Sequence, residues 1–233
     1  MNSRSCITIG KHSIHVSFKQ IKHLRLSFNR RTHSISLSAP IGIDHATILA
    51  FLQSRQSWLD KQSSSVPPCI TQVSYLDAEQ IMLAGKSYTL RVLENQSCNR
   101  IVIEHEQIVL LLVTDMSLRQ RTALFDAWYR INLALRIEPL IKYWQRIMAV
   151  ELRTWSIMKM KSRWGSCNTK KRSIRFNLEL AKLADCLLEY VVVHELAHLI
   201  EPSHNHIFKS VVESFLPDWK TRKATLRTHI INY

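Results

Sequence analysis

The segment His194-Glu195-Leu196-Ala197-His198 places two imidazoles and one carboxylate within five residues. On an α-helix, residues four apart lie on the same face, so both histidines can turn a ring nitrogen toward one metal ion. Glu195 lies about a quarter-turn away, where it can reach a water on the metal without binding the metal itself. The spacing therefore predicts the active-site helix of a hydrolytic zinc site.

The residues around this motif predict that it lies on a helix. Asp185 is expected to cap the start of that helix, and Pro202, which cannot continue a helix, marks its end. The apolar residues recur near helical spacing: Leu187, Leu188, Val191, Leu196 and Leu199. A buried helix with two incidental histidines is the alternative, because a short motif can occur by chance.

A third protein ligand is needed to complete a catalytic zinc site. His204 is the first candidate, because imidazole suits zinc and a turn after the helix can bring it back, leaving the fourth position for water. His206 and Glu213 are the alternatives, and Glu213 lies on a segment with helical apolar spacing. One zinc ion per chain is expected in each case.

Several segments together carry a family resemblance. They are residues 163–167 (Arg-Trp-Gly-Ser-Cys), 174–177 (Ile-Arg-Phe-Asn), 190–199, His204 with Phe208, and 216–219 (Leu-Pro-Asp-Trp). In combination they resemble the YgjP-like family of metal-dependent hydrolases, relatives of the WLM and SprT-like zincin metallopeptidases. More weakly, residues 38–40, 58–59 and 83–86 look like the N-terminal part of that family. The resemblance spans most of residues 15–230 as one unit.

The resemblance implies zinc ligands at His194, His198 and His204 and a general base at Glu195. The family often has Asn before its third histidine and Ser after it, whereas this chain has Ser203 and Asn205. It also implies that residues 174–178 form an edge strand that holds an extended peptide by main-chain hydrogen bonds. Four side chains are candidate contacts to the substrate or transition state, with surface pairing, capping or packing as their alternative roles: Arg163, Arg175, Asn177 and Tyr190.

The five cysteines show neither a disulfide framework nor a C-x-x-C zinc clip. Cys167 lies in a Gly-Ser-Cys turn close to basic residues, which are expected to lower the pKa of its thiol. A catalytic cysteine at this position is an alternative to the histidine site, but the metal centre already supplies a nucleophile.

The pattern of apolar residues predicts an α+β chain, with a β-rich N-terminal half and a zincin-like, helical C-terminal catalytic half. A small antiparallel sheet with a turn at 29–33 is expected first, then a helix over 44–61 and a Ser/Pro linker at 63–68. More strands and a long helix over 118–149 follow, and no internal repeat is visible. The predicted regions are 1–68, 69–116 and 117–233.

The formal net charge is +14, and it is unevenly distributed. Residues 1–43 contain seven Lys/Arg and no acid, and residues 153–175 contain eight and no acid. Such a bias attracts polyanions, so nucleic acid or a nucleic-acid-bound protein is a possible partner, although a basic surface can also serve solubility alone. No apolar run is long enough to span a bilayer, and a cytoplasmic location is expected.

Together these features predict a zinc metallopeptidase of the HExxH zincin type that hydrolyses peptide or protein substrates. Zinc would polarise the scissile carbonyl and activate water, and Glu195 would shuttle the proton. The alternative is a basic module that binds nucleic acid or ribonucleoprotein and keeps a structural or degenerate metal site. A closed structural site has four protein ligands and no use for Glu195, so the sequence favours the enzyme.

Overall fold

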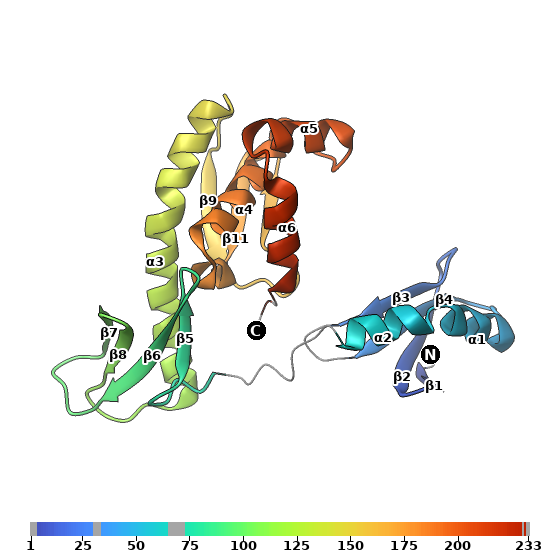
Figure 1. Ribbon diagram of the computed structural model, residues 1–233, viewed down its shortest axis with the longest axis horizontal. Coiled ribbons are helices and arrows are strands. Elements are labelled where there is room, and N and C mark those ends of the chain that lie inside the picture. Colours follow the sequence, from blue (N-terminus) through green and yellow to red (C-terminus); the bar gives the residue numbers. More distant parts are fainter. Residues whose placement is uncertain (1–3, 30–33, 65–72, 230, 232–233) are drawn as a thin grey trace. The chain divides into compact units, whose positions relative to one another are not determined.

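The computed structural model describes residues 4–29, 34–64, 73–229 and 231. Within them the chain has six α-helices, one 3-10 helix and three β-sheets, with strands concentrated in the N-terminal half and helices in the C-terminal half. This confirms the predicted mixed α/β chain. The chain divides into two compact units, Met1–Thr71 and Gln72–Tyr233 (Figure 1).

The first unit is a four-stranded sheet of order β1-β2-β4-β3 with two helices on one face (Figure 1). Its elements are β1 Arg4–Ile9, β2 His12–Lys19, β3 Arg25–Phe28, β4 Ile35–Pro40, α1 His45–Ser54 and α2 Gln56–Ser64. Inward residues such as Ile14 and Leu37 pack against Leu52 and Leu59. The expected helix over 44–61 is therefore two helices, and the predicted turn and linker lie largely outside the described residues.

The prediction of a purely antiparallel first sheet is wrong, because β2 and β4 pair in parallel. The chain passes from β2 to the far edge, forms β3 there, and returns through β4 into the centre. Alternating apolar residues predict strands but carry no information about which strands pair. β4 runs parallel to β2 because the chain first passes through β3, to which β4 is antiparallel.

The second unit begins with the same strand pattern. Its first sheet has the order β5-β6-β8-β7, again with a parallel central pair and antiparallel outer pairs. The strands are β5 Gln80–Leu83, β6 Lys86–Leu93, β7 Arg100–Glu104 and β8 Gln107–Leu111. In both sheets a two-residue turn joins the first two strands, and a helix follows the last strand. The structure thus contains a repeated topology that the sequence does not reveal.

The rest of the second unit builds around the long helix α3, Leu118–Ile147. The remaining elements are β9 Thr154–Met158, β10 Gly165–Asn168, β11 Ser173–Asn177, the 3-10 helix η1 Leu178–Lys182, α4 Asp185–Ala197, α5 His206–Phe215 and α6 Trp219–Thr228. One hydrophobic core runs from Tyr75 to Leu226, so the predicted regions 69–116 and 117–233 share it. None of the described helices combines the length and apolar character needed to cross a membrane.

The β5–β6 turn is fixed to the segment that precedes α4. Ala84 and Gly85 both have positive φ, as a tight hairpin turn requires, and their amides donate to the carbonyls of Ala181 and Lys182 at 2.9 Å. A Cβ on Gly85 would lie 2.7 Å from Cβ of Ala184 and 2.9 Å from its Cα. Only glycine allows this close approach of the turn to the start of α4.

We expect Gly85→Ala to lower the free energy of unfolding by about 2–4 kcal/mol, because it adds a backbone collision to an unfavourable φ. Urea unfolding followed by tryptophan fluorescence measures this loss. Gly42→Ala is the matched control, since Gly42 also has positive φ but a Cβ there meets nothing within 4 Å. Strain alone should cost the control about 1 kcal/mol; equal losses for the two variants would contradict the packing explanation.

Candidate metal centre

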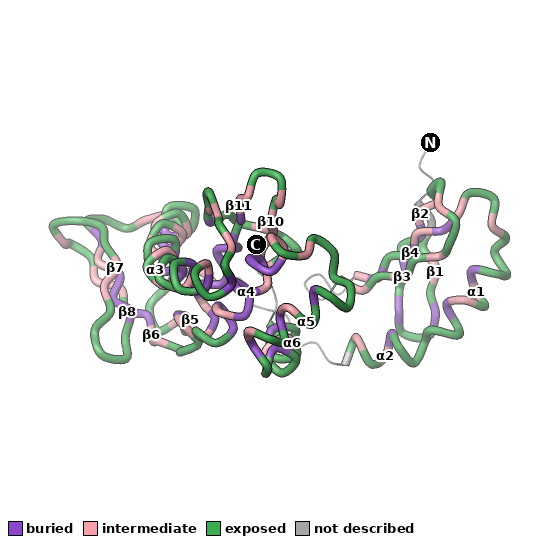
Figure 2. The backbone as a smooth tube through the Cα atoms, turned by 90° about the horizontal axis from the view of Figure 1, so that it is seen from above, coloured by how far each residue is buried: buried purple, intermediate pink, exposed green. Residues whose placement is uncertain are grey.

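The helix that carries the motif, α4, is buried on nearly all sides (Figure 2). It packs against α3, α5, α6 and β10, which explains why its sequence is apolar all round. The prediction of Asp185 as N-cap is off by one residue: Ala184 occupies the cap, and Asp185 accepts a hydrogen bond from Nε of Arg136 at 2.8 Å. His194 and Glu195 lie in the last turn, and His198 is the C-cap.

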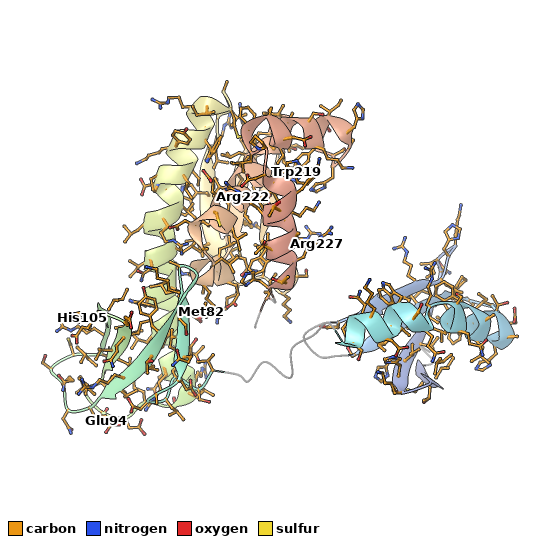
Figure 3. The ribbon with its side chains drawn as sticks, viewed as in Figure 1. Met82, Glu94, His105, Trp219, Arg222 and Arg227 are labelled. Atoms are coloured by element: carbon orange, nitrogen blue, oxygen red, sulfur yellow. The ribbon has the colours of Figure 1, made fainter. Side chains whose placement is uncertain are left out.

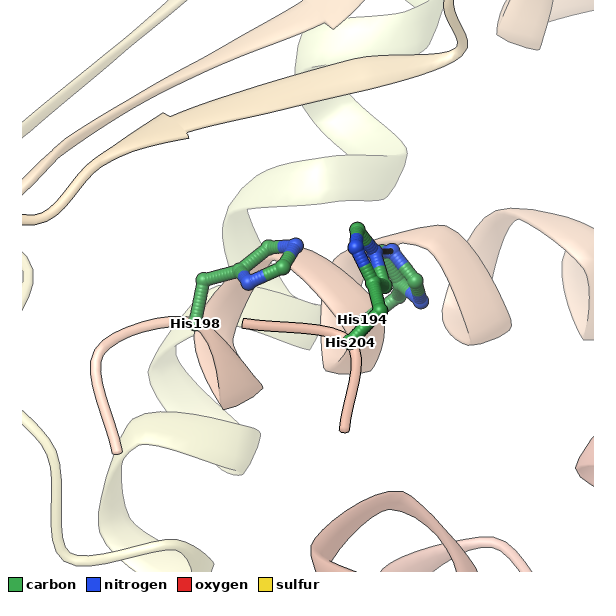
Figure 4. Close-up of side chains that lie close together, drawn as sticks. All are labelled: His194, His198 and His204. Carbon is green, nitrogen blue, oxygen red and sulfur yellow. Dashed lines mark hydrogen bonds between the residues drawn. The ribbon is translucent and has the colours of Figure 1, made fainter. Parts of the chain in front are cut away.

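His194, His198 and His204 converge on one point (Figure 4). The nitrogens that they can offer to a metal all lie within 4.8 Å of one another, and the Nε2 atoms of His194 and His204 are 3.0 Å apart. His204 reaches this position from the turn after α4, as predicted from its place beyond Pro202. The grouping defines a candidate metal centre.

Phe208 supports all three imidazoles. Its ring centroid lies 4.9 Å from that of His194, 4.6 Å from that of His198 and 4.8 Å from that of His204. Asn205 caps α5 by accepting a hydrogen bond from the Phe208 amide at 3.0 Å, which fixes the aromatic ring relative to the turn. Asn205, where the family often has Ser, therefore has a structural role.

The three histidines fit a single zinc ion. Two imidazole nitrogens on one tetrahedral zinc lie roughly 3.3–3.4 Å apart. Here the Nε2 atoms of His194 and His204 are 3.0 Å apart, and the whole group lies within 4.8 Å. Burial, followed by His198 and His204, lowers the pKa of His194 to about 3, and burial also lowers the pKa of His198. Both imidazoles are then neutral at pH 7, so their ring nitrogens can act as ligands.

Unpaired polar atoms gather at the same place. Among the described residues, three buried side-chain nitrogen or oxygen atoms lack a hydrogen bond of normal geometry, and two of them are Oε2 of Glu195 and Nδ1 of His198. The carbonyls of Glu201 and Pro202 lie near His198 and oppose the fall in its pKa. Buried polar atoms are rarely left without partners, so this grouping is consistent with a ligand site.

Glu195 is buried beside Gly165. Its residue is 5% exposed, and burial raises the pKa of its carboxyl to about 8, with Arg163 acting in the opposite direction. A Cβ on Gly165 would lie 2.6 Å from Oε1 and 2.7 Å from Cγ of Glu195. The absence of a side chain at position 165 of β10 thus makes room for the carboxylate of Glu195. Gly165 is part of the Trp-Gly-Ser motif, but its role was not predicted.

A cavity of about 620 Å³ contains this centre, which is within the usual range for ligand sites. Six of the predicted site residues line it: Arg163, Tyr190, His194, Glu195, His198 and His204. The rival ligands lie elsewhere. Glu213 forms an ion pair with Lys220 at 2.8 Å, and His206 is the exposed first residue of α5.

Arg175 and Asn177 do not line the cavity. Arg175 is exposed on β11, whereas Asn177 is completely buried. The amide of Asn177 donates to the carbonyls of Met160 and Arg163, both at 2.7 Å. Asn177 therefore holds the loop that carries Arg163, a supporting role in place of the direct substrate contact predicted from the sequence.

The prediction that residues 174–178 form the edge strand is wrong. The sheet has the order β10-β11-β9, so β11 is paired on both sides. The segment expected to be a turn, from Gly165 to Cys167, is strand β10, and all three of these residues line the cavity. Of the described strands, β10 is the edge of this sheet on the cavity side.

The prediction of a lowered pKa for the Cys167 thiol is wrong. Burial, and after it the charge of Glu195, raises the pKa of its thiol to about 11. The basic residues near it in sequence do not outweigh these two effects. Cys167 is therefore a neutral thiol at pH 7 and is not an activated nucleophile.

The sequence matches a known protein family. A family model described as YgjP-like, metallopeptidase domain, matches residues 22–229. The match covers most of the chain, so the protein belongs to the YgjP-like metallopeptidase family. No curated protein matches the sequence.

Two solved structures are similar to part of the chain. The metallopeptidase zymogen abylysin of Pyrococcus abyssi is 23% identical, with a TM-score of 0.37, over 40% of this chain and 92% of its own. The metallopeptidase zymogen jannalysin of Methanocaldococcus jannaschii is 21% identical, with a TM-score of 0.35, over 39% and 92%. Membership of the family rests on the family model alone.

Proposed function

We propose that this protein is a zinc-dependent peptidase of the zincin type. His194, His198 and His204 hold one zinc ion, and Glu195 is the general base. The observation that carries this proposal is the convergence of three imidazoles and a buried carboxylate in one cavity. Membership of a metallopeptidase family supports hydrolysis of peptide bonds over other reactions.

When bound, zinc supplies a Lewis acid that polarises a substrate carbonyl and favours ionisation of water. Glu195 takes the proton from the attacking water and returns it to the leaving amine. A carboxyl group with a pKa near neutrality suits both transfers. Gly165 keeps the space in which this carboxylate lies.

We place the substrate beside β10. The cavity-side edge of this strand can hold an extended peptide through main-chain hydrogen bonds. Tyr190 lines the same cavity, and burial raises its pKa to about 12, so its hydroxyl remains a donor at pH 7. We assign Tyr190 the stabilisation of the developing oxyanion.

Metal removal tests the proposed function. Hydrolysis of casein and of a fluorogenic peptide mixture should stop after chelation and return with about one equivalent of zinc per chain. Circular dichroism before and after chelation separates loss of metal from loss of fold. A folded, zinc-loaded protein that hydrolyses no peptide would sink the proposal and favour a binding role for the same metal site.

A further inference from the structure

The cavity around the metal centre is strongly cationic. Among the described residues, three positively charged side chains line it, Arg163, Lys223 and Arg227, together with one carboxylate, that of Glu195. Lys223 and Arg227 come from α6, along which Figure 3 labels Trp219 and Arg227. Arg163 comes from the loop that leads into β10. Positive charge therefore enters the cavity from two different walls.

Lys223 has no carboxylate partner within ion-pair distance among the described residues. Its ammonium lies 5.3 Å from the ring centroid of Trp219, and burial together with the charges of Arg227 and Lys209 lowers its pKa. Lys223 also lies close enough to His194 to lower the pKa of that imidazole. Lys223 thus lies among other cations beside the metal centre and has no ion-pair partner among the described residues, so its ammonium is available to pair with an anion.

Other cations of α6 are neutralised within the protein. Lys220 pairs with Glu213 at 2.8 Å, and Arg222 pairs with Glu189 at 2.6 Å and with Asp218 at 2.9 Å. The contrast with Lys223 lies within one helix, so a generally basic composition does not explain it. Lys223 differs because it faces the cavity.

Arg163 makes the second wall of the cavity cationic as well. No ion pair of its side chain occurs in the described parts of the chain, and its charge lowers the pKa of Glu195. The Arg163 backbone is held in place, because its carbonyl accepts the hydrogen bond from Asn177 at 2.7 Å. A guanidinium on a fixed loop beside the reacting centre suits recognition of a carboxylate.

We infer that this site selects acidic peptides, with carboxylate side chains next to the scissile bond paired to Lys223 and Arg163. The inference rests on the proposed function and names its substrate class. Complementary charges favour the acidic substrate and reject a basic one, for which the described lining of the cavity offers no partner carboxylate other than Glu195.

Three fluorogenic peptides of equal length test the inference, with Glu, Gln or Lys on both sides of the scissile bond. We expect kcat/KM to fall about 5–10-fold from the Glu to the Gln peptide and further for the Lys peptide, with smaller ratios at high salt. Lys223→Glu should reverse the order of the Glu and Lys peptides, and Lys223→Arg should keep it. Lys220→Glu, one turn earlier and outside the cavity, should leave the ratios unchanged.

The outcomes of this experiment separate the preference for acidic peptides from the proposed peptidase function. Equal hydrolysis of the three peptides, or the same ratios in Lys223→Glu as in the wild type, would overturn the inference and leave the peptidase intact. Absence of hydrolysis of all three would count against the proposed function. Fluorescence anisotropy of the same peptides with the zinc-loaded Glu195→Gln protein then still decides the charge preference, because equal affinities would overturn it.

Discussion

Replacing Glu195 by glutamine is expected to lower kcat for peptide hydrolysis about 10²–10⁴-fold, the usual contribution of a general base. Glutamine keeps the size of the side chain but cannot take a proton from water. The imidazoles are untouched, so zinc content should remain that of the wild type. KM should change little, because in the proposed site the substrate is held by β10 and the cationic walls of the cavity, which this substitution leaves unchanged.

Glu213→Gln is the matched control for this variant. Glu213 was a rival ligand on sequence grounds, but it pairs with Lys220 at 2.8 Å and does not line the cavity. It should keep both zinc and turnover. Undiminished turnover in Glu195→Gln would refute the assignment of Glu195 as the general base. Loss of zinc together with loss of turnover would instead show that Glu195 is a ligand.

Gly165→Ala is expected to lower kcat about 10–100-fold while zinc stays bound, because a misplaced catalytic group loses rate steeply. The added Cβ would lie 2.6 Å from Oε1 of Glu195, so the carboxylate must move. The three histidines of the metal centre lie outside β10, so the added methyl group does not displace them. The expected result is an enzyme with its metal centre intact and its base out of position.

A double-mutant cycle isolates this contact. Aspartate at position 195 is one methylene shorter and leaves room for a methyl group on residue 165. Gly165→Ala should therefore cost much less in the Glu195→Asp protein than in the wild type, so that the two effects are not additive. Strict additivity would mean that Gly165→Ala acts elsewhere, for example on the pairing of β10 with β11.

The part of the site that could be predicted from sequence is the part that is local in sequence. His194 and His198 share one helix face and His204 follows after one turn, so spacing and the chemistry of imidazole sufficed. The contact of Gly165 with Glu195 joins residues thirty positions apart on different elements. It depends on how β10 packs against α4, which no local pattern encodes.

Strand pairing shows the same limit. Apolar alternation located the strands of the first sheet, but the parallel pairing of β2 and β4 depends on a return of the chain from the far edge. Similarly, Gly165 and Ser166 read locally as a turn, and only pairing with β11 makes them a strand. Cys167 shows the same limit for a pKa, because burial of its thiol, and after it the charge of Glu195, outweighs the basic neighbours in sequence.

The metal content of the purified protein, measured by plasma mass spectrometry, tests the central claim most directly. The wild type and the control His206→Ala should each carry about one zinc per chain, whereas His198→Ala and His204→Ala should each retain less than about a tenth of that. Circular dichroism should confirm that all four proteins are folded. A folded wild type without metal, or full zinc in His204→Ala, would contradict a centre built from these three histidines.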